Sequence, residues 1–61
     1  MSDAEIMSTI HDRLSPHEVQ EWFRASYDEI RDAVVTIARV DGIDRAVKDT
    51  KELFVAWLQA K

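Results

Sequence analysis

The chain has 61 residues, no cysteine, a formal net charge of −4 and 46% hydrophobic residues. This length suits one small domain and excludes a multidomain enzyme, and the lack of cysteine excludes disulfides and the strongest zinc ligand. The negative charge argues against binding to nucleic-acid phosphates, and the apolar content is too high for a disordered chain. No apolar run reaches the roughly 18 residues of a membrane span and the first residues are acidic, so we expect a cytoplasmic protein.

The first predicted helix covers residues 3–14. Ser2 and Glu5 stand three positions apart, as in a capping box, where each side chain bonds the backbone N–H of the other residue. Apolar residues then recur every three or four positions, which is the spacing of one helix face. These residues are Ile6, Met7, Ile10 and Leu14.

The second predicted helix is long and covers residues 16–40. Its start is marked by Ser15 as an N-cap, Pro16 at the first helical position and Glu18 at the third. An apolar face then continues for about six turns, and no glycine or proline interrupts it. The residues of this face are Val19, Trp22, Phe23, Ile30, Ala33, Val34 and Ile37.

The third predicted helix covers residues 45–60. Gly42 is expected to end the preceding helix as a C-cap, and Asp44 is expected to be the next N-cap. The apolar side of this helix comprises Ala46, Val47, Thr50, Leu53, Phe54, Trp57 and Leu58. The sequence therefore predicts an all-α fold: a single helical domain over residues 1–61, built as a small three-helix bundle with a long central helix and antiparallel neighbours.

Acidic residues are concentrated in the first half of the chain. Residues 1–32 carry eight acids and three arginines, a net charge of −5, whereas residues 33–61 carry four acids and five bases, a net charge of +1. One arc of the predicted central helix carries Glu18, Glu21, Asp28, Glu29 and Asp32. This arc is either an ordinary solvated face, balanced by nearby arginines and the helix dipole, or a docking stripe for a basic patch on a partner.

Two further groups of residues are candidates for contact with another chain. Trp22 and Tyr27 belong most simply to the core, but either one would serve as a partner-binding anchor if the third helix left it exposed. Val35 and Val55 fall on the polar arcs of their predicted helices. Single exposed valines are ordinary, yet a homodimer that covers both would add apolar burial to a thin core.

The sequence offers no pattern for catalysis, and we expect no enzyme activity and no cofactor. A single glycine excludes a Gly-rich phosphate loop, and three short helices rarely enclose a reactive pocket. The two histidines, His11 and His17, lie near Asp12 and Glu21 at the first predicted turn. The spacing of His17 and Glu21 suits a surface hydrogen bond as well as metal ligation, and we expect no metal.

These features predict a small acidic helical interaction module that binds and modulates, most simply by inhibition, a larger protein. Its size and charge are typical of regulators encoded by phages or mobile elements. The alternative is a self-assembling, homo-oligomeric structural or subunit protein. A weaker alternative is an acidic mimic that blocks a nucleic-acid-binding groove. No direct contact with nucleic acid or membrane is expected.

Overall fold

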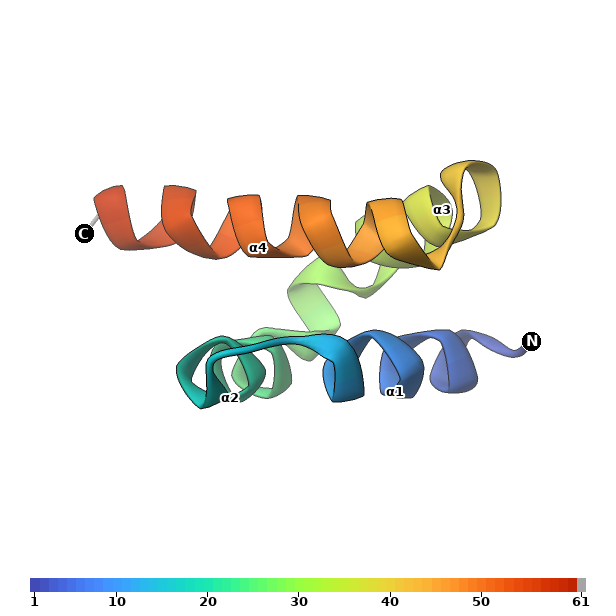
Figure 1. Ribbon diagram of the computed structural model, residues 1–61, viewed down its shortest axis with the longest axis horizontal. Coiled ribbons are helices and arrows are strands. Elements are labelled where there is room, and N and C mark those ends of the chain that lie inside the picture. Colours follow the sequence, from blue (N-terminus) through green and yellow to red (C-terminus); the bar gives the residue numbers. More distant parts are fainter. Residues whose placement is uncertain (61) are drawn as a thin grey trace.

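The computed structural model describes residues 1–60, which form four helices: α1 (Asp3–Arg13), α2 (His17–Ala25), α3 (Tyr27–Asp41) and α4 (Ile43–Gln59). No strand occurs within this range, so the predicted all-α class is confirmed, whereas the predicted count of three helices is wrong. In Figure 1, α4 runs along one side of the molecule, α1 and α2 lie on the other, and α3 passes from the second layer to the first.

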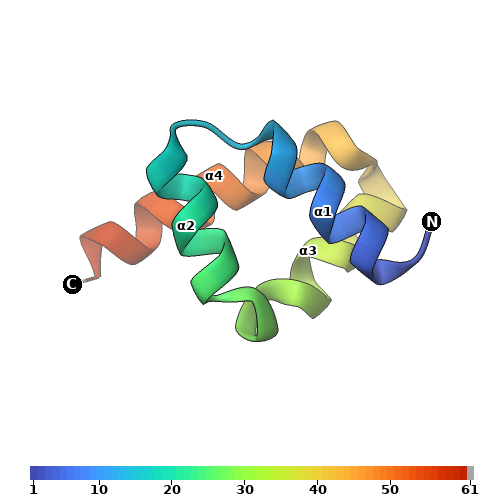
Figure 2. The same cartoon turned by 90° about the horizontal axis from the view of Figure 1, so that it is seen from below.

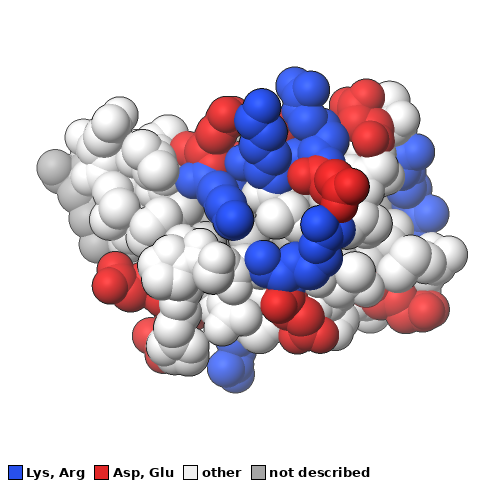
Figure 3. Space-filling model, viewed as in Figure 1, with Lys and Arg blue, Asp and Glu red and all other residues white. Residues whose placement is uncertain are grey.

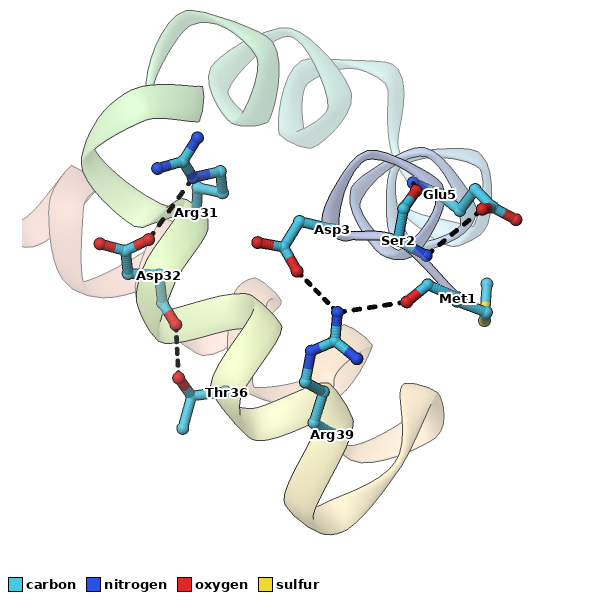
Figure 4. A network of polar contacts seen from close by, with 8 residues as sticks. All are labelled: Met1, Ser2, Asp3, Glu5, Arg31, Asp32, Thr36 and Arg39. Atoms are coloured by element: carbon cyan, nitrogen blue, oxygen red, sulfur yellow. Dashed lines mark hydrogen bonds and ion pairs between the residues drawn. The ribbon is translucent and has the colours of Figure 1, made fainter.

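The start of α1 is the predicted capping box. The backbone N–H of Glu5 donates to Ser2 Oγ at 3.2 Å, and the backbone N–H of Ser2 donates to Glu5 Oε1 at 3.3 Å. Arg39 of α3 fixes the same end of the chain from outside, because its Nη2 donates to Asp3 Oδ1 at 2.7 Å and to the carbonyl of Met1 at 3.2 Å (Figure 4). The first helix is thus fixed both by its own cap and by a contact with α3.

The start of α2 differs from the prediction by one position. Pro16 is the N-cap rather than the first helical residue, because its backbone is extended with φ −72° and ψ −180°. Its carbonyl accepts from the Val19 N–H at 3.0 Å, and no side chain caps the helix, so the predicted cap at Ser15 is wrong.

The predicted long helix over 16–40 is wrong, because it is divided at Ser26. The backbone of Ser26 leaves the helical region, with φ −100° and ψ 11°, and this residue is both the C-cap of α2 and the N-cap of α3. An unbroken helix of that length would measure about 37 Å, which exceeds the longest extent of the molecule, 33 Å. Figure 2 shows α2 and α3 meeting at a sharp corner, which lets both contact α4.

A single residue, Gly42, joins α3 to α4. It is the C-cap of α3, as predicted, and its φ of +97° lies in the region that favours glycine. The same residue is also the N-cap of α4, since its carbonyl accepts from the Ala46 N–H at 3.1 Å. Helix α4 therefore begins at Ile43, two residues earlier than predicted, and the expected N-cap role of Asp44 is wrong. Asp44 lies in the first turn instead and pairs with Arg13 at 2.6 Å.

The core lies where α3 meets α1 and α4. Val34 is fully buried and Val35 is 7% exposed, so the expectation that Val35 lies on an exposed polar arc is wrong. The cause is that α3 has neighbours on two sides, and two successive positions about 100° apart can both be covered. The core residues are Ile6, Met7, Ile10, Leu14, Val19, Trp22, Phe23, Val34, Val35, Ala38, Ala46 and Val47.

Thr50 is the one polar residue buried with this core among residues 1–60. Its hydroxyl donates to the Ala46 carbonyl at 2.7 Å, which satisfies the group inside the helix itself. None of the four helices is long and apolar enough to cross a membrane.

Because Val35 is buried and Val55 is 49% exposed, the two valines should respond oppositely to a charge. Val35→Glu places a carboxylate in the core and should lower the free energy of unfolding by more than about 3 kcal/mol. Val55→Glu should change it by less than about 0.5 kcal/mol. Urea denaturation followed by circular dichroism measures both, and equal destabilisation by the two variants would contradict the observed packing.

The capping box predicts a pH dependence. Hydrogen bonds from the backbone of Ser2 and then from its side chain lower the pKa of Glu5 below the ordinary value of 4.5. A lowered native pKa means that this contribution to stability is present above pH 4.5 and is lost as the pH falls through the native pKa. Ser2→Ala should therefore raise the pKa of Glu5 in an NMR titration and lower the stability at pH 7. The variant keeps the larger contribution, from the backbone N–H of Ser2, so the rise should be partial, and an unchanged pKa would contradict the contribution of the Ser2 side chain.

Candidate functional site

The five predicted acidic docking residues are all exposed, but they do not lie on one helix. Glu18 and Glu21 lie on α2, whereas Asp28, Glu29 and Asp32 lie on α3. The corner at Ser26 separates the two groups, so the geometry of a continuous arc, which depended on an unbroken helix, is wrong.

The two predicted aromatic anchors, Trp22 and Tyr27, are both turned toward the core, but Trp22 is more deeply buried than Tyr27. Trp22 is 8% exposed and Tyr27 is partly buried against the core. Trp22 faces α4 and not solvent: its ring centroid lies 5.6 Å from that of Phe54, in an edge-on arrangement, and 6.2 Å from that of Trp57. Phe54 and Trp57 stack on each other at 6.1 Å. The three rings join α2 to the second half of α4.

A concave surface lies beside this aromatic cluster, between α2 and the C-terminal half of α4. We call it the α2–α4 groove; its volume is about 400 Å³. The residues that line it are Glu18, Glu21, Trp22, Ala25, Ser26, Phe54, Trp57 and Leu58. Its floor is aromatic and aliphatic, and its α2 side carries two carboxylates.

The C-terminal half of α4 is the most apolar exposed part of the described chain. Leu53, Val55, Trp57 and Leu58 are between 39% and 49% exposed. Both ribbon views show the cause, since the end of α4 extends past α2 and has no helix on its outer side (Figures 1 and 2). The sequence places Leu53, Trp57 and Leu58 on the apolar side of α4, but periodicity does not show how far along a helix its apolar side is covered.

Charge is distributed unevenly around this surface. Figure 3 shows uncharged surface at the end where α4 finishes, carboxylates beside it, and lysine and arginine side chains gathered over the middle of the molecule. The basic residues on α4 are Arg45, Lys48 and Lys51, all in its first half, and Arg45 is paired with Asp49 at 3.1 Å. Among residues 1–60, the α2–α4 groove therefore has an acidic rim and no lysine or arginine in its lining.

The two rim carboxylates differ in their surroundings. Glu21 Oε1 lies 3.0 Å from His17 Nε2, the surface hydrogen bond that the i,i+4 spacing allowed. Glu18 makes no ion pair with another residue in the range 1–60. One carboxylate is thus available to a new cation, and the other is held only by an exposed histidine.

Reactive chemistry has little geometric support in the described part of the chain. His11 is partly buried and its Nδ1 lies 3.3 Å from Asp12 Oδ1. A second hollow of about 330 Å³ lies between α1 and the α2–α3 corner, with His11, Ser8 and Tyr27 in its lining, but no hydrogen bond joins these three residues. No group of three or more potential metal ligands occurs among residues 1–60.

One polar atom beside the groove is unsatisfied. The indole Nε1 of Trp22 is buried and has no hydrogen-bond acceptor within residues 1–60. A buried donor without a partner costs about 1–3 kcal/mol, so Trp22 contributes to stability through the packing of its ring and not through its N–H. Sequence reasoning selected Trp22 as an aromatic but had no means of showing this unsatisfied donor.

Two substitutions separate these contributions. Trp22→Phe keeps a ring against Phe54 and Trp57 but removes the unsatisfied donor, so the free energy of unfolding should change by less than about 1 kcal/mol. Trp22→Ala removes the ring and should lower it by about 3–5 kcal/mol. Urea denaturation measures both values. If Trp22→Phe were as destabilising as Trp22→Ala, the indole N–H would have a partner in solution.

Comparison with known proteins gives no further identification. No protein family matches this chain, and no curated protein or solved structure is significantly similar to it.

Proposed function

We propose that this protein is a small acidic interaction module that binds a larger protein through its helix faces and modulates it, most simply by inhibition. The observation that carries the proposal is the α2–α4 groove, where an apolar floor, a concave shape and an acidic rim occur together. Large apolar side chains exposed on neighbouring positions are typical of protein-binding surfaces. Inhibition follows if the bound segment is one that the larger protein needs for its own activity.

The small size of the fold supports binding rather than catalysis. The two hollows are open to solvent at the surface of the bundle, and the described chain offers no aligned nucleophile and base. A surface of this kind acts by occupying a site on another molecule, and specificity then depends on the match of shape and charge.

Self-assembly into a homo-oligomer is the alternative, and its support is reduced. The proposed oligomer patch depended on Val35 and Val55, and Val35 is buried within the chain. The acidic-mimic alternative also loses support, because the carboxylates on α2 and α3 do not continue along one helix.

A matched pair of variants tests the proposal. Leu58→Glu places a charge in the groove lining, whereas Val40→Glu places the same charge on α3, where the side chain is 76% exposed. Affinity capture from a lysate of the host should recover the same partner with the wild-type protein and Val40→Glu. Recovery with Leu58→Glu should fall at least about tenfold, because a buried unpaired charge costs more than the 1.4 kcal/mol that this factor requires.

The controls for this experiment are structural. Circular dichroism should give the same helix signal for all three proteins, since both sites are exposed. Equal recovery of every captured protein by Leu58→Glu and the wild type would show that the groove is not the binding surface, and the proposal would then be wrong.

A further inference from the structure

We infer that the α2–α4 groove recognises an amphipathic helix that carries lysine or arginine beside its apolar face. This inference rests on the proposed function and adds to it the chemistry of the bound segment. Three properties of the groove carry it: the shape between two helices, the apolar floor and the charge of the rim.

The groove has the shape of a trough between two helices, into which a third helix would fit. Two helices form the walls, and the aromatic contacts of Trp22 with Phe54 and Trp57 hold them together at the floor. Side-chain ridges of a third helix pack well into such a trough. The molecule already contains this arrangement, since α3 packs against both α1 and α4. A helix in the groove would give the C-terminal half of α4 the neighbour that its outer side lacks.

The floor requires apolar side chains on one face of the occupant. Trp57 is 39% exposed and Leu58 is 48% exposed, and the hollow of about 400 Å³ has room for large apolar groups from successive turns. An amphipathic helix presents such groups at i, i+3, i+4 and i+7, which is the usual pattern in helix-in-groove recognition.

The rim requires cations beside that apolar face. Glu18 has no ion pair within residues 1–60, and Glu21 is held only by His17. A lysine or arginine placed against them would be attracted, whereas a carboxylate would be repelled. Residues 1–32, which include α2, carry a net charge of −5, which favours the approach of a cationic segment over that of an anionic one.

The same charges disfavour a second copy of this chain as the occupant. Each copy carries a net charge of −4, so two copies repel at long range. The basic residues of α4 are few, and one of them, Arg45, is already paired with Asp49. A cationic helix from another protein fits the acidic rim without this repulsion.

The chain provides its own reporter for the test. Its two tryptophans, Trp22 and Trp57, both line the groove, so their fluorescence responds to an occupant. The probe is a synthetic helix of roughly 18 residues without tryptophan, with leucine on one face and lysine on both sides of that face. The matched control peptide has glutamate at every lysine position.

The wild-type protein should bind the lysine peptide at least about tenfold more tightly than the glutamate peptide at low salt. Glu18→Lys with Glu21→Lys should weaken binding of the lysine peptide at least about tenfold. Asp28→Lys with Asp32→Lys makes the same change in net charge on α3 and should weaken it less than about threefold. Leu58→Glu should weaken both peptides, because it changes the floor.

Three results of the peptide experiment would overturn the inference. Equal binding of the two peptides would show that the rim does not select charge. Equal loss in the α2 and α3 charge variants would show general attraction to an acidic protein. Absence of binding by either peptide would show that a cationic amphipathic helix is not the occupant.

The Leu58→Glu capture experiment tests the proposed function separately. If that variant loses the captured partner but the peptides do not bind as expected, the proposed function stands and only the inference about the cationic helix is wrong. Sedimentation equilibrium of the wild-type protein measures its oligomeric state and so tests whether a second copy of the chain occupies the groove. A dimer that Leu58→Glu dissociates would assign the groove to a second copy and overturn both proposals. A monomer under the conditions of peptide binding agrees with both.

Discussion

The corner at Ser26 is the constraint on which the other contacts depend. It divides one amphipathic stretch into α2 and α3, and the two helices then meet α4 at different places. Because α3 turns away, it lies between α1 and α4 and buries both Val34 and Val35. Because α2 lies beside the second half of α4, Trp22 contacts Phe54 and Trp57. A straight helix could not bring both sets of contacts together within a molecule 33 Å long.

Some features set by near neighbours in the chain were predictable from the sequence, although the caps expected at Ser15 and Asp44 are wrong. The capping box of Ser2 and Glu5 and the turn at Gly42 each depend on a few adjacent residues, and both are present. The corner at Ser26 gives no such signal, because the apolar spacing from Val19 to Ile37 continues across it and no glycine or proline marks it. Tertiary packing overrides the local preference for one continuous helix, because the break lets both α2 and α3 contact α4.

The candidate site was predictable in its chemistry but not in its geometry. The acidic character of Glu18 and Glu21 follows from the sequence, as does the apolar character of Trp57 and Leu58. The meeting of these residues in one groove depends on the crossing of α2 over α4, which periodicity does not encode. Trp22 illustrates the difference, because its pattern indicates a core residue or an anchor, while its position makes it the floor of a groove.

The unsatisfied donor and the uncovered end of α4 occur in the same part of the molecule. Helix α4 is packed well in its first half, where Ala46 and Thr50 are buried, and poorly in its second. The described chain therefore places most of its exposed large apolar side chains at the end of α4, while the groove there still shares Trp22 with the core. The exposed residues of this surface can vary without loss of the core, whereas Trp22 cannot.

The one-residue connection at Gly42 also bears on how the protein assembles. Only one residue separates α3 from α4, so forming the contacts between them closes a short loop and costs little chain entropy. The contact of Trp22 with Phe54 closes a loop of about 30 residues and forms at a higher entropic cost. We therefore expect the α3–α4 hairpin to form early and the groove to be completed late. A partner that recognises the groove would then bind only the finished fold and leave folding intermediates untouched.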